Sequence, residues 1–133
     1  MEKYKVFRIS EPHIVNDDIY CQDLVDNGSC LALTLNAVHR SISIKITFDF
    51  FYIYSKSNES YRLETIDKIP DDRYLILTVE NSRLAEWLHK ESKGIYSDDD
   101  VVHYLIITSD EVIDVLSSIP PSIEWSEKGK KIL

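Results

Sequence analysis

The chain has 133 residues, 44% of them hydrophobic and 11% aromatic, which suits one folded domain and excludes a disordered chain. Its formal net charge of −8 disfavours direct nucleic-acid binding, because neutralising phosphates requires a basic surface. No apolar segment follows Met1, and the longest apolar run, Phe50 to Tyr54, is far too short for a membrane span. We therefore expect a cytoplasmic protein with one globular domain over residues 1–125 and a frayed tail at 126–133.

The N-terminal residues predict a strand, since Tyr4 and Val6 alternate with neighbours of the opposite face and Pro12 would end the run. The following stretch, His13 to Asn27, is polar and aperiodic. It closes with Asn27-Gly28, a turn signal. We expect a loop there.

A hairpin is predicted next. Alternate leucines at residues 31–35 indicate a half-buried strand, and residues 42–50 alternate over a longer run with Ile and Phe on one face. A short connector at residues 36–40 fits the turn between them. The alternation breaks at Phe50-Phe51-Tyr52, where either a bulge or a strand buried on both faces is expected.

Residues 55–60, rich in Ser, Asn and Lys, predict a turn. Tyr61–Ile66 and Tyr74–Val79 are interpreted as two further strands, joined by a loop that carries Pro70, Asp71 and Asp72. Short loops between successive strands favour an antiparallel meander.

One helix is clearly predicted, over about residues 82–93. Asn81 or Ser82 can cap it, and Gly94 is suited to end it in a left-handed conformation. Its apolar face would consist of Leu84, Trp87 and Leu88, with Trp87 in the core.

Residues 101–108 predict another strand. The segment 110–118 fits either a helix started by a Thr108–Glu111 capping box or, from its β-branched content, the return arm of a hairpin, which we favour slightly. Pro120-Pro121 ends the element in both cases. The fold class expected is α+β, a mainly antiparallel sheet of about five to seven strands with one helix.

The excess of acidic residues falls in two blocks that contain no Lys or Arg, at residues 9–39 and 98–127. Such blocks are typical of a solubilising surface, or of a negative face that steers a basic partner. The second block supplies the candidates for partner binding, Asp98, Asp99, Asp100, Asp110 and Glu111, and we expect it to form a surface of one sign.

Three aromatic residues complete the candidate partner-binding set: Tyr52, Tyr54 and Trp125. Most aromatic residues of the chain are expected to lie in the core or on the sheet surface. Trp125 would be either a strand-end plug or an interface anchor. The cysteines Cys21 and Cys30 are expected to be free thiols, because their spacing matches no redox or zinc motif.

A catalytic site would depend on the histidines. His89 and His103 could act with nearby aspartates, but no metal-binding spacing, GxSxG motif or glycine-rich loop occurs in the chain. His13 and His39 are expected in loops. Asp110 and Asp114 could form a carboxylate pair, although acids are too common here for that to be specific. We expect no metal and no cofactor, and a core or rim position for His103.

The C-terminal part resembles small bacterial proteins of the toxin-immunity type. The likeness covers residues 81–125, with NSRLAEWLHKES followed by VVHYLIITSDEVIDVLSSIPPSIEW. The positions that carry it are Asn81-Ser82-Arg83, Trp87-Leu88, His103-Tyr104, Asp114-Val115 and Pro121. This resemblance implies a non-enzymatic immunity or antitoxin inhibitor that binds a partner protein, and an acidic surface would suit a basic nuclease toxin. The alternatives are a small enzyme using His89 and His103 with nearby carboxylates, and a phage-encoded counter-defence protein.

Overall fold

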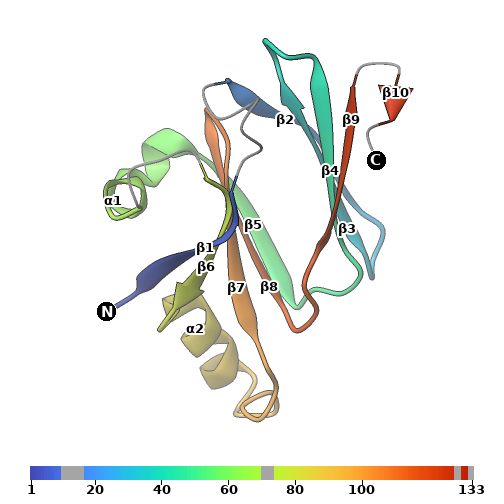
Figure 1. Ribbon diagram of the computed structural model, residues 1–133. Coiled ribbons are helices and arrows are strands. Elements are labelled where there is room, and N and C mark those ends of the chain that lie inside the picture. Colours follow the sequence, from blue (N-terminus) through green and yellow to red (C-terminus); the bar gives the residue numbers. More distant parts are fainter. Residues whose placement is uncertain (10–16, 70–73, 128–129, 132–133) are drawn as a thin grey trace.

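The computed structural model describes residues 1–9, 17–69, 74–127 and 130–131. In this part of the chain two antiparallel five-stranded sheets pack face to face, and the helices lie on the outer side of one of them (Figure 1). Sheet A has the order β1 (Lys3–Ile9), β6 (Tyr74–Glu80), β7 (Val102–Ile107), β8 (Glu111–Ser117), β5 (Ile53–Asn58). Sheet B has the order β10 (Lys130–Lys131), β9 (Ser122–Glu127), β4 (Ile42–Phe48), β3 (Leu31–Ala37), β2 (Ile19–Asp26). The predicted α+β class with a mainly antiparallel sheet is confirmed.

The main core lies between the two sheets. Sheet B contributes alternate residues of β3 and β4, such as Leu33 and Ile46, and sheet A contributes residues such as Ile106 and Ile113, all fully buried. The predicted β3–β4 hairpin is confirmed, with Leu35 opposite Ile44 and Leu33 opposite Ile46. Strict alternation identified this pair correctly because one face meets the core and the other is solvated.

The outer face of sheet A is also buried, beneath helices. Leu77, Leu105 and Val112 form a second apolar cluster, which Ile66 of the short helix α1 (Leu63–Asp67) covers. β7 and β8 are therefore apolar on both faces. The predicted strand at residues 101–108 and the hairpin interpretation of residues 110–118 are both confirmed.

The longer helix α2 (Arg83–Glu91) matches the predicted helix. Ser82 is its N-cap, with the Ser82 hydroxyl accepting from the Ala85 amide at 3.0 Å. Gly94 has a φ of 78°, the left-handed conformation expected after the helix. The prediction that Trp87 lies in the core is wrong: it is 50% exposed, and Leu88 is the buried residue of the helix.

The loop predicted at residues 13–27 is partly wrong, since β2 occupies Ile19–Asp26. β2 pairs only with β3, and its register shifts between Cys21 and Asp23, so its faces do not alternate cleanly. An edge strand with a bulge lacks the period on which sequence reasoning relies. Pro12 and His13 lie outside the described residues.

The next correction concerns residues 55–66. The predicted turn at 55–60 is mostly the edge strand β5, followed by a 3-10 turn, η2 (Glu59–Tyr61), and the predicted strand at 61–66 is largely α1. The Asn58 side chain accepts from the Ser60 amide, which starts the helical turns. Polar side chains on the exposed side of β5 explain its turn-like composition. The predicted loop at Pro70, Asp71 and Asp72 lies outside the described residues.

The single meander is replaced by a chain that moves between sheets. β4 pairs with β9 in sheet B, and β5, the strand after β4, pairs with β8, the strand before β9, in sheet A. Residues 49–52 and 118–121 therefore lead from one sheet to the other at the same corner, which accounts for the predicted break at Phe50-Phe51-Tyr52. The tail expected from residue 126 is corrected too, since β9 runs to Glu127 and Lys130–Lys131 pair with it; residues 128–129 and 132–133 are not described.

Candidate functional site

The corner between the sheets brings together residues that are far apart in the sequence. The Ser117 hydroxyl bonds the Phe50 carbonyl at 2.6 Å, and the Tyr52 amide donates to the Leu116 carbonyl at 2.8 Å. These bonds hold residues 50–52 against the end of β8. On the other side, turns at residues 94–101 place Tyr96 and Asp99 beside them, through amide bonds such as Asp99 to the Tyr96 carbonyl at 3.1 Å.

We call Phe50, Tyr52, Tyr96 and Asp98–Asp100 the corner patch. The Tyr52 hydroxyl donates to the Asp99 carboxylate at 2.9 Å. The Tyr52 ring lies 4.8 Å from that of Phe50, edge to face, and 5.2 Å from that of Tyr96. Burial, followed by the hydrogen bond to Asp99, raises the pKa of Tyr52. Two predicted partner-binding elements, Tyr52 and the Asp98–Asp100 run, thus form one surface.

The corner patch carries unneutralised negative charge. Asp98, Asp99 and Asp100 are all exposed, and no Lys or Arg of the described residues forms an ion pair with them. Tyr52 and Tyr96 are half-buried, so that parts of their rings remain in contact with solvent. The patch can therefore offer carboxylates and aromatic faces to a cationic group.

The other predicted site residues lie elsewhere. Asp110 and Glu111 are at the β7–β8 turn, the opposite end of β7 from Asp100, and Glu111 pairs with Lys56 at 2.8 Å. Tyr54 donates to Asp26 at 3.2 Å. Trp125 packs half-buried against the main core, opposite Ile44. The structure does not bring these residues into the corner patch.

The acidic C-terminal third does not form a surface of one sign, which corrects that expectation. Asp114 is 3% exposed and pairs with Arg62, and Glu111 pairs with Lys56. Glu124 and Glu127 are on β9 of the other sheet. Spacing along a strand determines the face of a residue, whereas charge density in the sequence does not.

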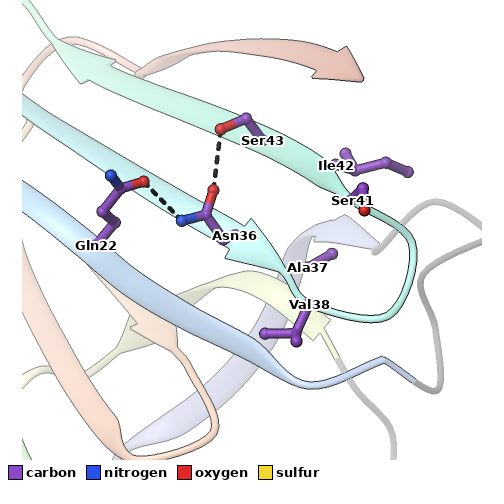
Figure 2. Close-up of a pocket in the computed structure, with 7 residues that line it drawn as sticks. All are labelled: Gln22, Asn36, Ala37, Val38, Ser41, Ile42 and Ser43. Carbon is purple, nitrogen blue, oxygen red and sulfur yellow. Dashed lines mark hydrogen bonds between the residues drawn. The ribbon is translucent and has the colours of Figure 1, made fainter. Parts of the chain in front are cut away.

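The outer face of sheet B has a shallow hollow of about 460 Å³ at the β3–β4 turn (Figure 2). Figure 2 shows a polar ladder across three strands: Asn36 donates to Gln22 at 2.6 Å and accepts from Ser43 at 3.0 Å. Because these side chains satisfy one another and none is charged, the hollow offers little to orient a ligand.

Sequence reasoning missed a buried polar chain on the outer face of sheet A. Ser82 Oγ lies 2.7 Å from His103 Nδ1, and His103 Nε2 lies 2.8 Å from Asp114 Oδ1. Arg62, just before α1, donates through both terminal nitrogens to the Asp114 carboxylate, and Ser55 of β5 donates to it at 3.2 Å. We call Ser82, His103, Asp114 and Arg62 the buried relay.

Asp114 is ionised within this relay. Burial alone would raise the pKa of its carboxyl, but hydrogen bonds from His103 and Arg62 outweigh that effect and hold the pKa at about 2. The relay joins the N-terminus of α2 to β7, β8 and the segment before α1. It also fills an otherwise apolar face with mutually satisfied polar groups.

The depressed Asp114 pKa predicts acid sensitivity. A carboxyl whose folded-state pKa lies below its unfolded value of 3.8 stabilises the fold above that value, and the contribution is lost as pH falls toward about 2. We expect Asp114 to account for a loss of about 2 kcal/mol in the free energy of unfolding between neutral pH and pH 2. Urea titrations over this pH range should show a smaller decrease in the free energy of unfolding for Asp114→Asn than for the unmodified protein. Equal decreases would contradict the stabilising role of the ionised Asp114.

The remaining histidines do not join this relay. His39 lies beside Asp18 at 3.3 Å in an exposed turn, and His13 is outside the described residues. His89 is on α2, and its Nδ1 has no hydrogen-bond partner among the described residues. No group of three or more His, Cys, Asp or Glu suited to a metal ion occurs within residues 1–9, 17–69, 74–127 and 130–131. Cys21 and Cys30 are free thiols, as expected.

No helix in the described part of the chain has the length and apolar character needed to cross a membrane. Comparisons with protein-family models, with curated proteins and with solved structures gave no match.

Proposed function

We propose that the protein binds a basic protein partner through the corner patch. One observation carries the proposal: three exposed carboxylates, which form no ion pair with a Lys or Arg of the described residues, adjoin a cluster of three aromatic rings, and the Tyr52–Asp99 hydrogen bond joins the two parts. Lys and Arg side chains of a partner can contact carboxylates and ring faces at such a surface.

The carboxylates and the aromatic rings of the corner patch would contribute to binding in different ways. Exposed carboxylates accelerate encounter with a basic partner and make the association rate depend on salt. Tyr side chains supply contact area at low entropic cost and are frequent energetic anchors at interfaces. The Tyr52–Asp99 bond restricts Tyr52 before binding, which lowers the entropy lost on association.

An immunity-type inhibitor of a basic toxin, such as a nuclease, is the specific form of partner binding that we favour. It rests on the resemblance of residues 81–125 and on the negative charge of the chain. A phage counter-defence protein would use a similar acidic surface. A toxin gene beside the coding gene would distinguish the first from the second.

Neutralising the patch tests the proposal. The partner is first isolated as the protein that co-purifies with this chain from its native host. We expect the triple variant Asp98→Asn, Asp99→Asn, Asp100→Asn to bind that partner with an on-rate about tenfold slower at low salt. The salt dependence should become shallower and the off-rate should change less. Biolayer interferometry at several salt concentrations measures the on-rate, its salt dependence and the off-rate.

The matched control removes the same amount of charge elsewhere. Glu59, Asp67 and Glu124 are exposed acids outside the patch, and Glu59→Gln, Asp67→Asn, Glu124→Gln should leave the low-salt on-rate within about twofold of the original. If both triple variants slow association equally, net charge rather than the corner patch directs binding. An unchanged on-rate in the patch variant would place the interface elsewhere.

A further inference from the structure

With a neutral His103, the hydrogen bonds of the buried relay define one order of donors and acceptors. An ionised Asp114 only accepts, so His103 carries its proton on Nε2, and in the neutral imidazole the Nδ1 lone pair faces Ser82. Ser82 Oγ already accepts the Ala85 amide, which leaves its own proton free to point at Nδ1. The order is therefore a hydroxyl, a proton acceptor and an orienting carboxylate.

We propose that Ser82 is a nucleophile for acyl transfer, with His103 as its general base, and that it accepts acyl groups from small carboxylic esters. This activity goes beyond partner binding and uses different residues. A serine hydroxyl becomes nucleophilic when an adjacent base takes its proton, and the distances of 2.7 Å and 2.8 Å satisfy that requirement. The imidazole presents Nδ1 to the serine and Nε2 to the carboxylate, and a lone pair on either nitrogen can accept the proton.

The position of Ser82 at the start of α2 supports this chemistry. The helix N-terminus favours negative charge, and the Ala85 amide contacts Oγ directly. The amide of Arg83, the residue directly after Ser82, donates to the Glu2 carboxylate at 2.9 Å. This amide already holds a negative oxygen beside the serine, so it can hold the oxyanion of a tetrahedral intermediate once Glu2 moves aside.

Ser82 is nearly buried but borders two hollows at the surface. The residue is 8% exposed and contributes to two surface hollows, one of about 480 Å³ that it shares with Val102 and His103, and one of about 540 Å³ that it shares with Glu2 and His89. Both volumes lie within the usual range of small-molecule sites, which suits the ester of a small molecule.

The step balances with water as the only co-reactant. Oγ attacks the ester carbonyl carbon while its proton passes to His103 Nδ1. The carbon–oxygen bond to the leaving alcohol then breaks, and the alkoxide takes the proton from Nδ1. Water attacks the acyl-Ser82 ester by the same route, releases the carboxylic acid and restores the hydroxyl.

A fluorophosphonate probe tests the nucleophile directly, because an Oγ–phosphorus bond forms as fluoride leaves. We expect the folded protein to gain one probe group, mapped to Ser82 by peptide mass spectrometry, and the urea-unfolded protein to gain none. His103→Gln should slow labelling at least about tenfold, within the range of general-base contributions. Hydrolysis of p-nitrophenyl acetate should likewise be slower for His103→Gln than for the unmodified protein.

Two variants separate chemistry from folding. Ser82→Asn keeps an N-cap side chain but lacks the hydroxyl, so it should fold and remain unlabelled. Ser29→Ala removes an exposed hydroxyl far along the chain and should label at the original rate. The proposal is overturned if the folded protein takes no probe at Ser82, or if Ser82→Asn is labelled and hydrolyses the ester as the unmodified protein does.

Discussion

Replacing Ile46 with Asp is expected to unfold the protein at room temperature. Ile46 is fully buried between the two sheets, opposite Leu33 on one side and Ile123 on the other. A carboxylate there would have no partner, and burying such a group costs several kcal/mol, comparable with the total stability of about 5–15 kcal/mol of a domain. Circular dichroism and thermal melting measure the loss.

Thr47→Asp is the matched control for that substitution. Thr47 is the next residue on β4 and points to the outer face of sheet B, where it is half-exposed. The same new carboxylate can be hydrated there, so we expect a cost of about 1 kcal/mol at most. Equal melting temperatures for the two variants would show that the inward face of β4 is wrongly assigned.

Arg62→Ala is expected to be the most damaging change of a partly exposed residue. It removes two donors from Asp114, which is 3% exposed and ionised, and leaves that charge balanced only by neighbouring hydrogen bonds. Breaking a buried pair from one side costs about 3–5 kcal/mol. We expect a loss of that size in the free energy of unfolding measured with urea at neutral pH.

The control is an ion pair on the surface. Lys5 and Glu80 are paired with their side chains 64% and 45% exposed, so Lys5→Ala should change stability by less than about 1 kcal/mol. Should Arg62→Ala cost no more than Lys5→Ala, Asp114 would have to be satisfied without the guanidinium. The relay would then be assigned incorrectly.

Sequence patterns identified the elements in which a local signal is complete. β3 and β4 alternate because each has one buried and one solvated face, and α2 has a cap at Ser82, a buried Leu88 and a stop at Gly94. The edge strands β2 and β5 lack such a signal. β2 and β5 each pair on one side only, which left their sequences free to be polar, and β2 also contains a register shift.

The sequence contains a signal for part of the buried relay. His103 and Asp114 are ionisable residues within two largely apolar strands, and in the favoured hairpin they fall on the same face, since His103 pairs with Leu116 and Asp114 with Leu105. That reasoning could have joined the two residues. Arg62 has no such signal, because the pattern of residues 61–66 predicts a strand, whereas α1 begins at Leu63.

By itself the sequence determined the α+β class, the β3–β4 hairpin, the helix with its cap and the acidic run at Asp98–Asp100, since each depends on neighbours along the chain. Tertiary structure alone decided which distant groups meet. The Tyr52–Asp99 contact spans 47 residues and the Arg62–Asp114 contact spans 52, and both arise only where the chain passes between sheets or where a helix covers sheet A. The period of a strand specifies the face of each side chain, but the partner across that face is set by strand order, which no local pattern encodes.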